Sequence, residues 1–191
     1  DLPDDWEKLD VRSSEWIAWK RLGSESHNAT GVPRTKVYVS ISPLQLPLVV
    51  AQLLSSVFTI PQICEAKIAS SPLSLHRPDA FVLYCQSLGE LHSIANSLRS
   101  LCSGLHPSKM GFAPRFEQSD NLFWGFDPLS PELLVFGDSW RRAVCNRTAQ
   151  IASRFCSEGK LSSDLVAECT LLRLAVDGID PDTWNPPQSV L

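Results

Sequence analysis

The stretch TKVYVSISPLQLPLVVAQLLSSVFTIP, residues 35–61, decides the class of fold that we expect for this chain. Its first seven residues are rich in β-branched and aromatic side chains, which is typical of a strand. Ser42 and Pro43 then match the cap and the first position of a helix. The apolar run that follows is long enough for a buried helix, which Pro47 forces to start late or to kink. A strand followed by a buried helix predicts a core shared by sheet and helix.

The best-defined element further along is a helix that begins at Ser87. Ser87 and Glu90 stand three residues apart, which is the spacing of a capping box. The apolar residues that follow recur with a period of 3.6 and so share one face; they are Leu88, Leu91, Ile94, Ala95, Leu98 and Leu101. This pattern predicts an amphipathic helix that packs on the core.

The remaining elements follow no regular alternation. We expect strands over 63–69, 80–85 and 132–136, and helices from Asp138 to about Ser157 and from Ser162 or Ser163 to Asp177, closed by Gly178. The proline-rich region 103–131 is expected to be a long loop, and a loop of this length usually has a function. Neither a Gly-x-Gly-x-x-Gly motif nor a phosphate-binding loop occurs, which argues against a doubly wound nucleotide-binding fold.

We therefore predict an α+β fold, with a small mixed β-sheet flanked by helices in a single domain. This domain is expected to span residues 34–191. Residues 1–33 are polar and are expected to form an N-terminal extension that ends in a linker. Within it, Trp16 and Trp19 stand three residues apart, which favours a short helix.

The overall charge limits the classes of partner. The net charge is −4 and the isoelectric point is near 5.5, whereas a nucleic-acid partner requires a basic surface. No apolar run reaches the ~20 residues of a membrane span, because Gln45, Pro47 and Gln52 interrupt the longest one. We therefore expect neither a nucleic acid nor a membrane as partner.

The chain begins at Asp1 without a methionine, as expected of a fragment or a processed form.

The cysteines favour an intracellular protein without a metal site. They fall mostly at apolar-periodic positions, as buried thiols of a reducing cytoplasm do; they are Cys64, Cys85, Cys102, Cys145, Cys156 and Cys169. No Cys-x-x-Cys pair occurs, and no histidine stands at ligand spacing from a cysteine.

Cations stand at the edges of predicted strands, although the chain as a whole is acidic. Lys67 interrupts an apolar run, Arg77 comes just before a strand, and Arg115 lies in a loop between a proline and a phenylalanine. Bulk solubility does not require cations at these places. Their positions predict a site for a small anion.

Each of these cations has two interpretations. Lys67 either packs its stem while its amine reaches water, or has a pKa lowered by burial and by neighbouring arginines and accepts a proton. Arg77 either pairs with Asp79 or holds two oxygens of an anion in its fork. Arg115 either stacks on a nearby aromatic ring or aims its guanidinium at the anion.

Other candidates are weaker. His76 stands beside Arg77 and could act as an acid, and His106 and Lys109 either serve the site or are exposed loop residues. Arg141 and Arg142 belong to an arginine-rich helix whose simplest interpretation is a solvated face.

Six short motifs follow one another along the chain. They are Lys36-Val37-Tyr38-Val39; Lys67 in its apolar run; Arg77-Pro78-Asp79-Ala80-Phe81-Val82-Leu83-Tyr84; Pro114-Arg115-Phe116 with Gly125-Phe126-Asp127-Pro128; Phe136-Gly137-Asp138 with Arg141-Arg142; and Gly178-Ile179-Asp180-Pro181-Asp182. In this order, over residues 34–186, the sequence resembles the HopA-type effector family. That family includes bacterial type III effectors and stand-alone lyases that work beside a kinase in class V lanthipeptide and thioamitide biosynthesis.

The resemblance implies β-elimination of phosphate from phosphoserine or phosphothreonine in a precursor peptide, which leaves a dehydroamino acid. Lys67 would be the base that removes the Cα proton. Arg77 and Arg115 would clamp the phosphate, with Arg141 or Arg142 assisting. No metal or organic cofactor is implied. The expected partners are a phosphorylated peptide and a kinase, in the bacterial cytoplasm or, for an effector, outside the producing cell.

One departure from the family keeps a second interpretation open. The family's phenylalanine–glycine motif is usually followed by a histidine, and none stands between Gly137 and Arg142 here. If that histidine donates the proton to the leaving group, His76 or His106 would have to replace it. The alternative is a non-catalytic binding module that recognises a phosphorylated or plain peptide, or a partner kinase. A host-directed effector is a third possibility.

Overall fold

The structure, a computed structural model, describes residues 2–10, 15–24, 35–85, 87–108, 110–117, 119–126, 140–157 and 161–184. The chain forms two compact units. The first comprises Asp1–Met110 and Arg115–Phe126, and the second comprises Gly111–Pro114 and Asp127–Leu191. The domain limits expected from the sequence, with a boundary at residue 33, stay a prediction.

Six strands of the first unit form one sheet in the described part of the chain. Their order across the sheet is β1-β2-β4-β5-β3-β6, and every neighbouring pair is antiparallel. The strands are β1 (Trp6–Leu9), β2 (Trp16–Arg21), β3 (Thr35–Val39), β4 (Ile63–Ala69), β5 (Phe81–Cys85) and β6 (Leu122–Phe126). The α+β class is therefore confirmed.

The sheet is antiparallel where we expected a mixed one. A helix connects β3 to β4, and such a connection normally joins parallel strands. β3 and β4 do run parallel to each other, but β5 lies between them and is antiparallel to both. The parallel pair therefore exists without being adjacent.

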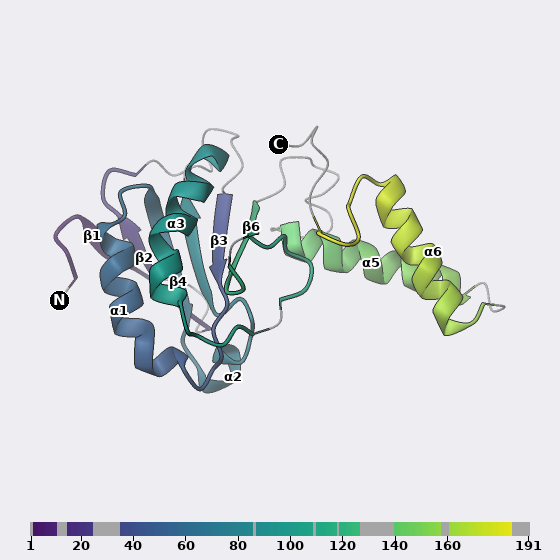
Figure 1. Cartoon of the computed structure of the whole chain (residues 1–191), viewed down its shortest axis with the longest axis horizontal. Coiled ribbons are helices and arrows are strands. Elements are labelled where there is room, and N and C mark those ends of the chain that lie inside the picture. The colour runs from purple at the N-terminus through teal and green to yellow at the C-terminus, as the bar shows by residue number, and fades with distance from the viewer. Residues whose placement is uncertain are drawn as a thin grey trace. The chain divides into compact units, whose positions relative to one another are not determined.

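Two helices, α1 (Leu46–Thr59) and α3 (Leu91–Cys102), cover one face of the sheet (Figure 1). We call it the helix face. Its core contains Phe81 and Leu83 of β5 together with Leu53 of α1 and Ile94 of α3, all buried. α1 starts late, as Pro47 predicted, so that its cap is Gln45 and not Ser42. The predicted apolar stripe of α3 is buried except for its two outer leucines, which pack against the core in part.

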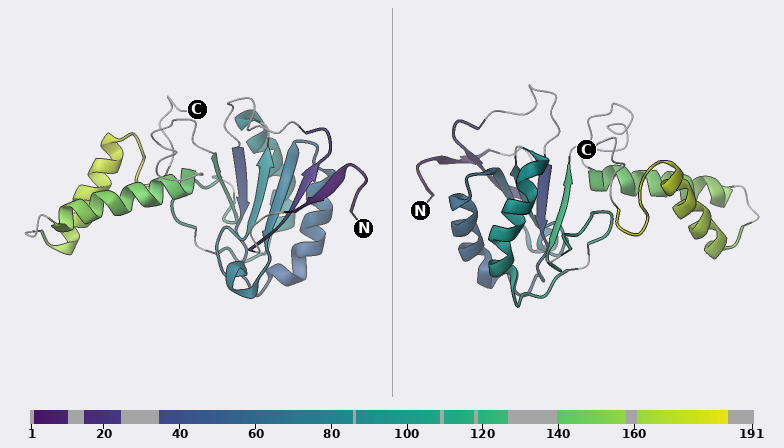
Figure 2. Two further views of the ribbon diagram at one scale, coloured as in Figure 1. Left: turned by 180° about the vertical axis from the view of Figure 1, so that it is seen from behind. Right: turned by 45° about the horizontal axis from the view of Figure 1, so that its top comes forward.

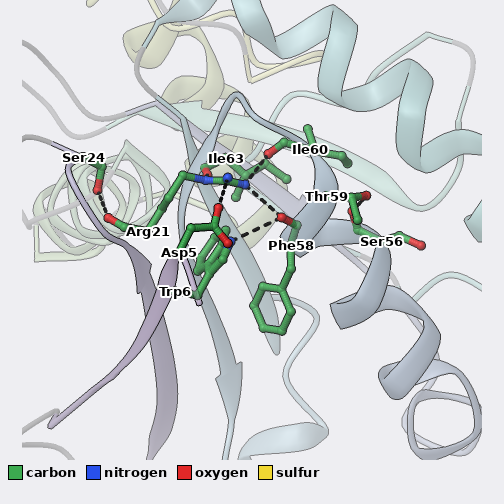
Figure 3. A network of polar contacts seen from close by, with 9 residues as sticks. All are labelled: Asp5, Trp6, Arg21, Ser24, Ser56, Phe58, Thr59, Ile60 and Ile63. Carbon is green, nitrogen blue, oxygen red and sulfur yellow. Dashed lines mark hydrogen bonds and ion pairs between the residues drawn. The ribbon is translucent and has the colours of Figure 1, made fainter. Parts of the chain in front are cut away.

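The N-terminal residues form a hairpin of strands where we expected irregular chain and a short helix. Trp16 and Trp19 both lie on β2, which pairs with β4. Arg21 explains why the hairpin attaches there (Figure 3). Its guanidinium donates to the backbone oxygens of Phe58 at 2.9 Å and Ile60 at 3.0 Å, at the carboxyl end of α1. A cation at this end satisfies carbonyl groups that the helix leaves without a partner.

The region 103–131, expected as a loop, contains the strand β6. Gly125 counts against a strand in the sequence, since glycine has no side chain to pack. In the structure a Cβ at residue 125 would lie 3.2 Å from the Tyr38 ring. The glycine therefore makes room for a neighbouring side chain. The strand expected over 132–136 lies outside the described residues.

The second unit is built on two helices, α5 (Trp140–Ser157) and α6 (Ser163–Val176). Arg147 and Arg173 both form ion pairs with Asp177, at 2.8 and 3.2 Å. The end of α6 is confirmed, with Gly178 at a φ of +83° directly after the cap. Asp138, the expected cap of α5, lies outside the described residues. No helix in the described part of the chain is long and apolar enough to cross a membrane.

Candidate active site

The face of the sheet opposite α1 and α3 carries charged and phenolic side chains, and we call it the lysine face. Figure 2, left, shows the sheet from this side. Because side chains alternate along a strand, β3 directs Lys36 and Tyr38 to this face and keeps its valines in the core. β4 contributes Glu65 and Lys67 in the same way, and β5 contributes Tyr84.

The register of the strands arranges these side chains in two rows. The first row, from β4 to β6, consists of Glu65, Tyr84, Lys36 and Gly125. The second row consists of Lys67, Val82, Tyr38 and Phe123. Residues that are distant in the sequence thus become neighbours through antiparallel pairing.

Tyr84 lies between two ammonium groups. The Lys67 Nζ donates a hydrogen bond of 3.2 Å to the Tyr84 hydroxyl and lies 4.7 Å from the centre of its ring. The Lys36 Nζ lies 5.2 Å from the centre of the same ring. A cation near an aromatic face is attracted by the negative side of the ring. The phenol therefore holds both lysines close to one point of the face.

Lys67 also forms an ion pair with Glu65. The Nζ lies 3.0 Å from Oε1 of Glu65, whose side chain is almost fully buried. Lys36, Tyr38 and Tyr84 are buried as well, whereas 23% of the Lys67 side chain is exposed. Solvent therefore reaches the cluster at Lys67.

The pKa of Lys67 is raised above its ordinary value, whereas the catalytic interpretation required it to be lowered. Burial is the largest single influence and does lower the pKa, but Tyr84 and Glu65 together raise it by more. The expectation assumed neighbouring arginines, and the groups that surround the amine are a carboxylate and a phenol instead. Lys67 is therefore an ammonium at neutral pH.

Arg77 pairs with Asp79, as the first of its two interpretations predicted. Its Nε and one terminal nitrogen donate to the two oxygens of Asp79 at 3.0 and 3.1 Å. The guanidinium also lies 5.2 Å from the centre of the Trp16 ring. The hydrogen bond to Asp79 is the main reason why the pKa of Arg77 is raised. Alternation along β2 places Trp16 on the lysine face, so that Arg77 stands at one edge of it.

Arg115 stands at the other edge of the lysine face. Its backbone forms an antiparallel bridge with Phe123, which extends the second row beyond β6. The side chain is 56% exposed and donates to Asp120 at 2.7 Å, so it does not stack on an aromatic ring in the contacts described. Trp16 and Arg115 are separated by five strand spacings, roughly 24 Å. The two arginines therefore flank the lysine cluster from opposite sides and do not surround one point.

The other predicted site residues are outside the two rows of the sheet. His76 is exposed at the end of the short helix α2 (Pro72–Leu75), and His106 is exposed in a loop where its backbone N–H donates to Gln45. Lys109 is not among the described residues. Arg141 and Arg142 belong to α5 of the second unit, where Arg141 donates to the Gly111 backbone oxygen at 3.2 Å.

Sequence reasoning missed four residues of the cluster as site residues: Lys36, Tyr38, Glu65 and Tyr84. A signal was present, because each strand places a charged or phenolic residue at alternate positions of an otherwise apolar run. A strand buried on both faces would be apolar throughout. Among the described residues, no group of three or more His, Cys, Asp and Glu side chains is placed to hold a metal ion.

The free thiols are less uniform than expected. Cys64, Cys85 and Cys102 are buried, and burial raises the pKa of Cys102 to about 11. Cys145 and Cys156, which we also expected to be buried, are exposed on α5 because they fall off its packed face.

Comparison with known proteins shows the fold but no relative in sequence. No family profile matches the chain, and no curated protein is similar to it in sequence. The solved structures with a similar fold include the type III effector and phosphothreonine lyase OspF from Shigella flexneri, with a TM-score of 0.52 and 20% identity over 65% of this chain and 71% of that chain. The phosphothreonine lyase SpvC, an effector from Salmonella, has a TM-score of 0.53 and 15% identity over 75% of this chain and 78% of that one.

An effector protein from Pseudomonas syringae pv. tomato covers more of the chain. It has a TM-score of 0.51 and 11% identity over 91% of this chain, which spans 63% of that structure. The fold that the resemblance implied is therefore confirmed: it is the fold of phosphothreonine lyase effectors. At these identities the likeness establishes the fold alone.

Proposed function

We propose that this chain is a phosphothreonine or phosphoserine lyase, which eliminates phosphate from a phosphorylated peptide. The observation that carries the proposal is the pair Lys36 and Lys67, held against one phenol ring on a sheet of the lyase fold. In the reaction the Cα proton is removed, the Cα–Cβ double bond forms, and the bond from Cβ to the phosphate oxygen breaks.

Lys67 is the base in this proposal. It is the most accessible member of the cluster, and its nitrogen is held in one position by Glu65 and Tyr84. Only the neutral amine accepts a proton, and the raised pKa makes that form a minority at neutral pH. Elimination should therefore become faster as the pH rises toward the pKa of Lys67.

Lys36 stabilises the charge that develops. Removal of the Cα proton places negative charge on the peptide carbonyl oxygen, and the phosphate carries two further charges. A buried ammonium is worth more against such charges than an exposed one, because water does not screen it. Lys36 is 6% exposed and lies on the far side of Tyr84 from Lys67. Arg77 and Arg115, at the two edges of the face, would then bind other parts of the phosphorylated substrate.

The resemblance suggests which substrate this is. A precursor peptide of lanthipeptide or thioamitide type, phosphorylated by a partner kinase in the bacterial cytoplasm, would be the natural one. The Shigella and Salmonella proteins of the same fold are effectors, which supports a host-directed role as a second possibility.

The test is incubation of the protein with a synthetic phosphothreonine peptide at mildly alkaline pH. We expect the peptide mass to fall by one phosphoric acid and inorganic phosphate to appear. Lys67→Ala should abolish both changes, whereas Lys8→Ala, an exposed lysine on β1, should leave them intact. Elimination that persists in Lys67→Ala would show that another group is the base.

A binding module without turnover is the second candidate, and the raised pKa of Lys67 favours it. A lysine that stays charged binds phosphate well and removes protons poorly. The same incubation separates the two functions. Saturable binding of the phosphopeptide without loss of phosphate at any pH would select the module.

A further inference from the structure

The lyase reaction needs a proton donor for the departing phosphate, and the lysine face offers one. The expected histidines do not qualify, because His76 and His106 are exposed on segments outside the two rows. Phosphate that leaves without a proton leaves as a strongly basic trianion. A donor within reach of the leaving oxygen removes that barrier.

We propose that Tyr38 is the general acid, which protonates the leaving phosphate oxygen. This inference rests on the proposed lyase function. Tyr38 is 4% exposed and lies in the row of Lys67, with the small side chain of Val82 between them. A phenol is a proton donor of suitable strength. Its ordinary pKa of about 10 keeps a phenol protonated at neutral pH, but it is lower than the pKa of the hydrogen phosphate dianion, so proton transfer to the leaving phosphate is favourable.

The Tyr38 hydroxyl is placed by the absence of a side chain on β6. A Cβ at residue 125 would lie 3.2 Å from the ring edge and 3.3 Å from the hydroxyl oxygen. With a Cβ at this position the ring would have to give by a few tenths of an ångström. Gly125 is the cross-strand partner of Lys36, so the Tyr38 hydroxyl lies beside the residue that pairs with Lys36.

This places the candidate groups in an order that suits the reaction. From β4 toward β6 the strands carry Lys67 on β4, Tyr84 on β5, and Lys36 and Tyr38 on β3, with the Tyr38 hydroxyl beside Gly125 of β6. The base and the acid therefore come from strands on either side of β5. Tyr84 is the other phenol of the cluster, and its hydroxyl accepts a hydrogen bond from Lys67 and so positions the base.

The Lys67 amine takes the Cα proton, the electron pair of that bond forms the double bond, and the Cβ–O bond breaks. The Tyr38 hydroxyl gives its proton to the departing oxygen. The products are the dehydroamino acid residue and hydrogen phosphate, with an ammonium on Lys67 and a phenolate on Tyr38. Solvent returns both groups to their starting states.

Two leaving groups test this role. A phosphothreonine peptide needs the acid, whereas the same peptide with a sulfothreonine does not, because sulfate is a very weak base. Tyr38→Phe should slow loss of phosphate by about 10²- to 10⁴-fold and leave loss of sulfate within a few-fold. Gly125→Ala, which crowds the ring without changing its chemistry, should slow loss of phosphate more than loss of sulfate, by less than Tyr38→Phe does. Thermal unfolding of each variant verifies that it is folded.

The outcomes are distinct. A wild-type protein that eliminates neither group refutes the lyase function itself. A wild-type protein that eliminates phosphate, with Tyr38→Phe equally active, refutes the role of Tyr38 alone. Equal slowing of both leaving groups would give Tyr38 a structural role and would also overturn the proposal.

Discussion

The two faces of the sheet come from the same strands and have opposite chemistry. On the helix face, Phe81 and Leu83 of β5 pack against α1 and α3. On the lysine face, Tyr84 of the same strand lies between Lys36 and Lys67. Because side chains alternate along a strand, one segment contributes both to the core and to the candidate site. Substitutions on one face should therefore change stability, and substitutions on the other should change chemistry.

Lys36→Met is the sharpest test of that division. Methionine keeps the length and packing of the side chain but removes the charge. We expect elimination to fall by about 10²- to 10³-fold, the usual cost of losing one group that stabilises developing charge. Release of inorganic phosphate under single-turnover conditions measures it. A variant that retains full activity would remove Lys36 from the site.

Leu83→Ala is the counterpart on the helix face. The side chain is fully buried, so that its truncation should cost about 2–5 kcal/mol of unfolding free energy. Urea unfolding measures the loss, and the fraction that remains folded should keep its rate of elimination. Lys36→Met should cost less stability than this. If Lys36→Met lowered the unfolding free energy by more than Leu83→Ala does, the lysine face would contribute to stability as well.

Glu65→Gln tests how a neighbour on the lysine face changes the pKa of Lys67. The carboxylate is one of the groups that raise the pKa of Lys67, by its charge and by its hydrogen bond. Without it that pKa falls, and more of the lysine is neutral amine at a given pH. The rise of kcat/KM with pH should therefore occur at lower pH in the variant. An unchanged profile would show that Lys67 does not limit the rate as a base.

Arg115→Ala should have the smallest effect. The side chain is exposed and paired with Asp120, where single charge contacts contribute little. We expect a few-fold weaker binding of the phosphorylated peptide and no change for the unmodified peptide, as isothermal titration would show. Arg99→Ala, on α3, is the matched control. Equal effects of Arg115→Ala on both peptides would remove its role toward phosphate.

Local patterns were enough to predict much of this fold. The capping box before α3 and its 3.6-residue period predicted a helix whose apolar face is buried, and the strand propensities of residues 35–41 and 63–69 predicted β3 and β4. These elements are determined by neighbours within one turn or a few residues. The N-terminal hairpin and β6 were missed because long-range contacts, such as Arg21 with α1 and Tyr38 with Gly125, decide them.

The site divides in the same way. Local sequence is enough to identify Lys67 as an unusual cation in an apolar strand, because periodicity and charge are local properties. Its surroundings depend on how the strands pair. Antiparallel pairing of β4, β5 and β3 brings Glu65, Tyr84 and Lys36 beside it, and Glu65 and Tyr84 raise its pKa where the catalytic interpretation required a lowered one. Electrostatic effects act through space, so the order of strands in the sheet, which local sequence does not encode, sets the chemistry of the lysine.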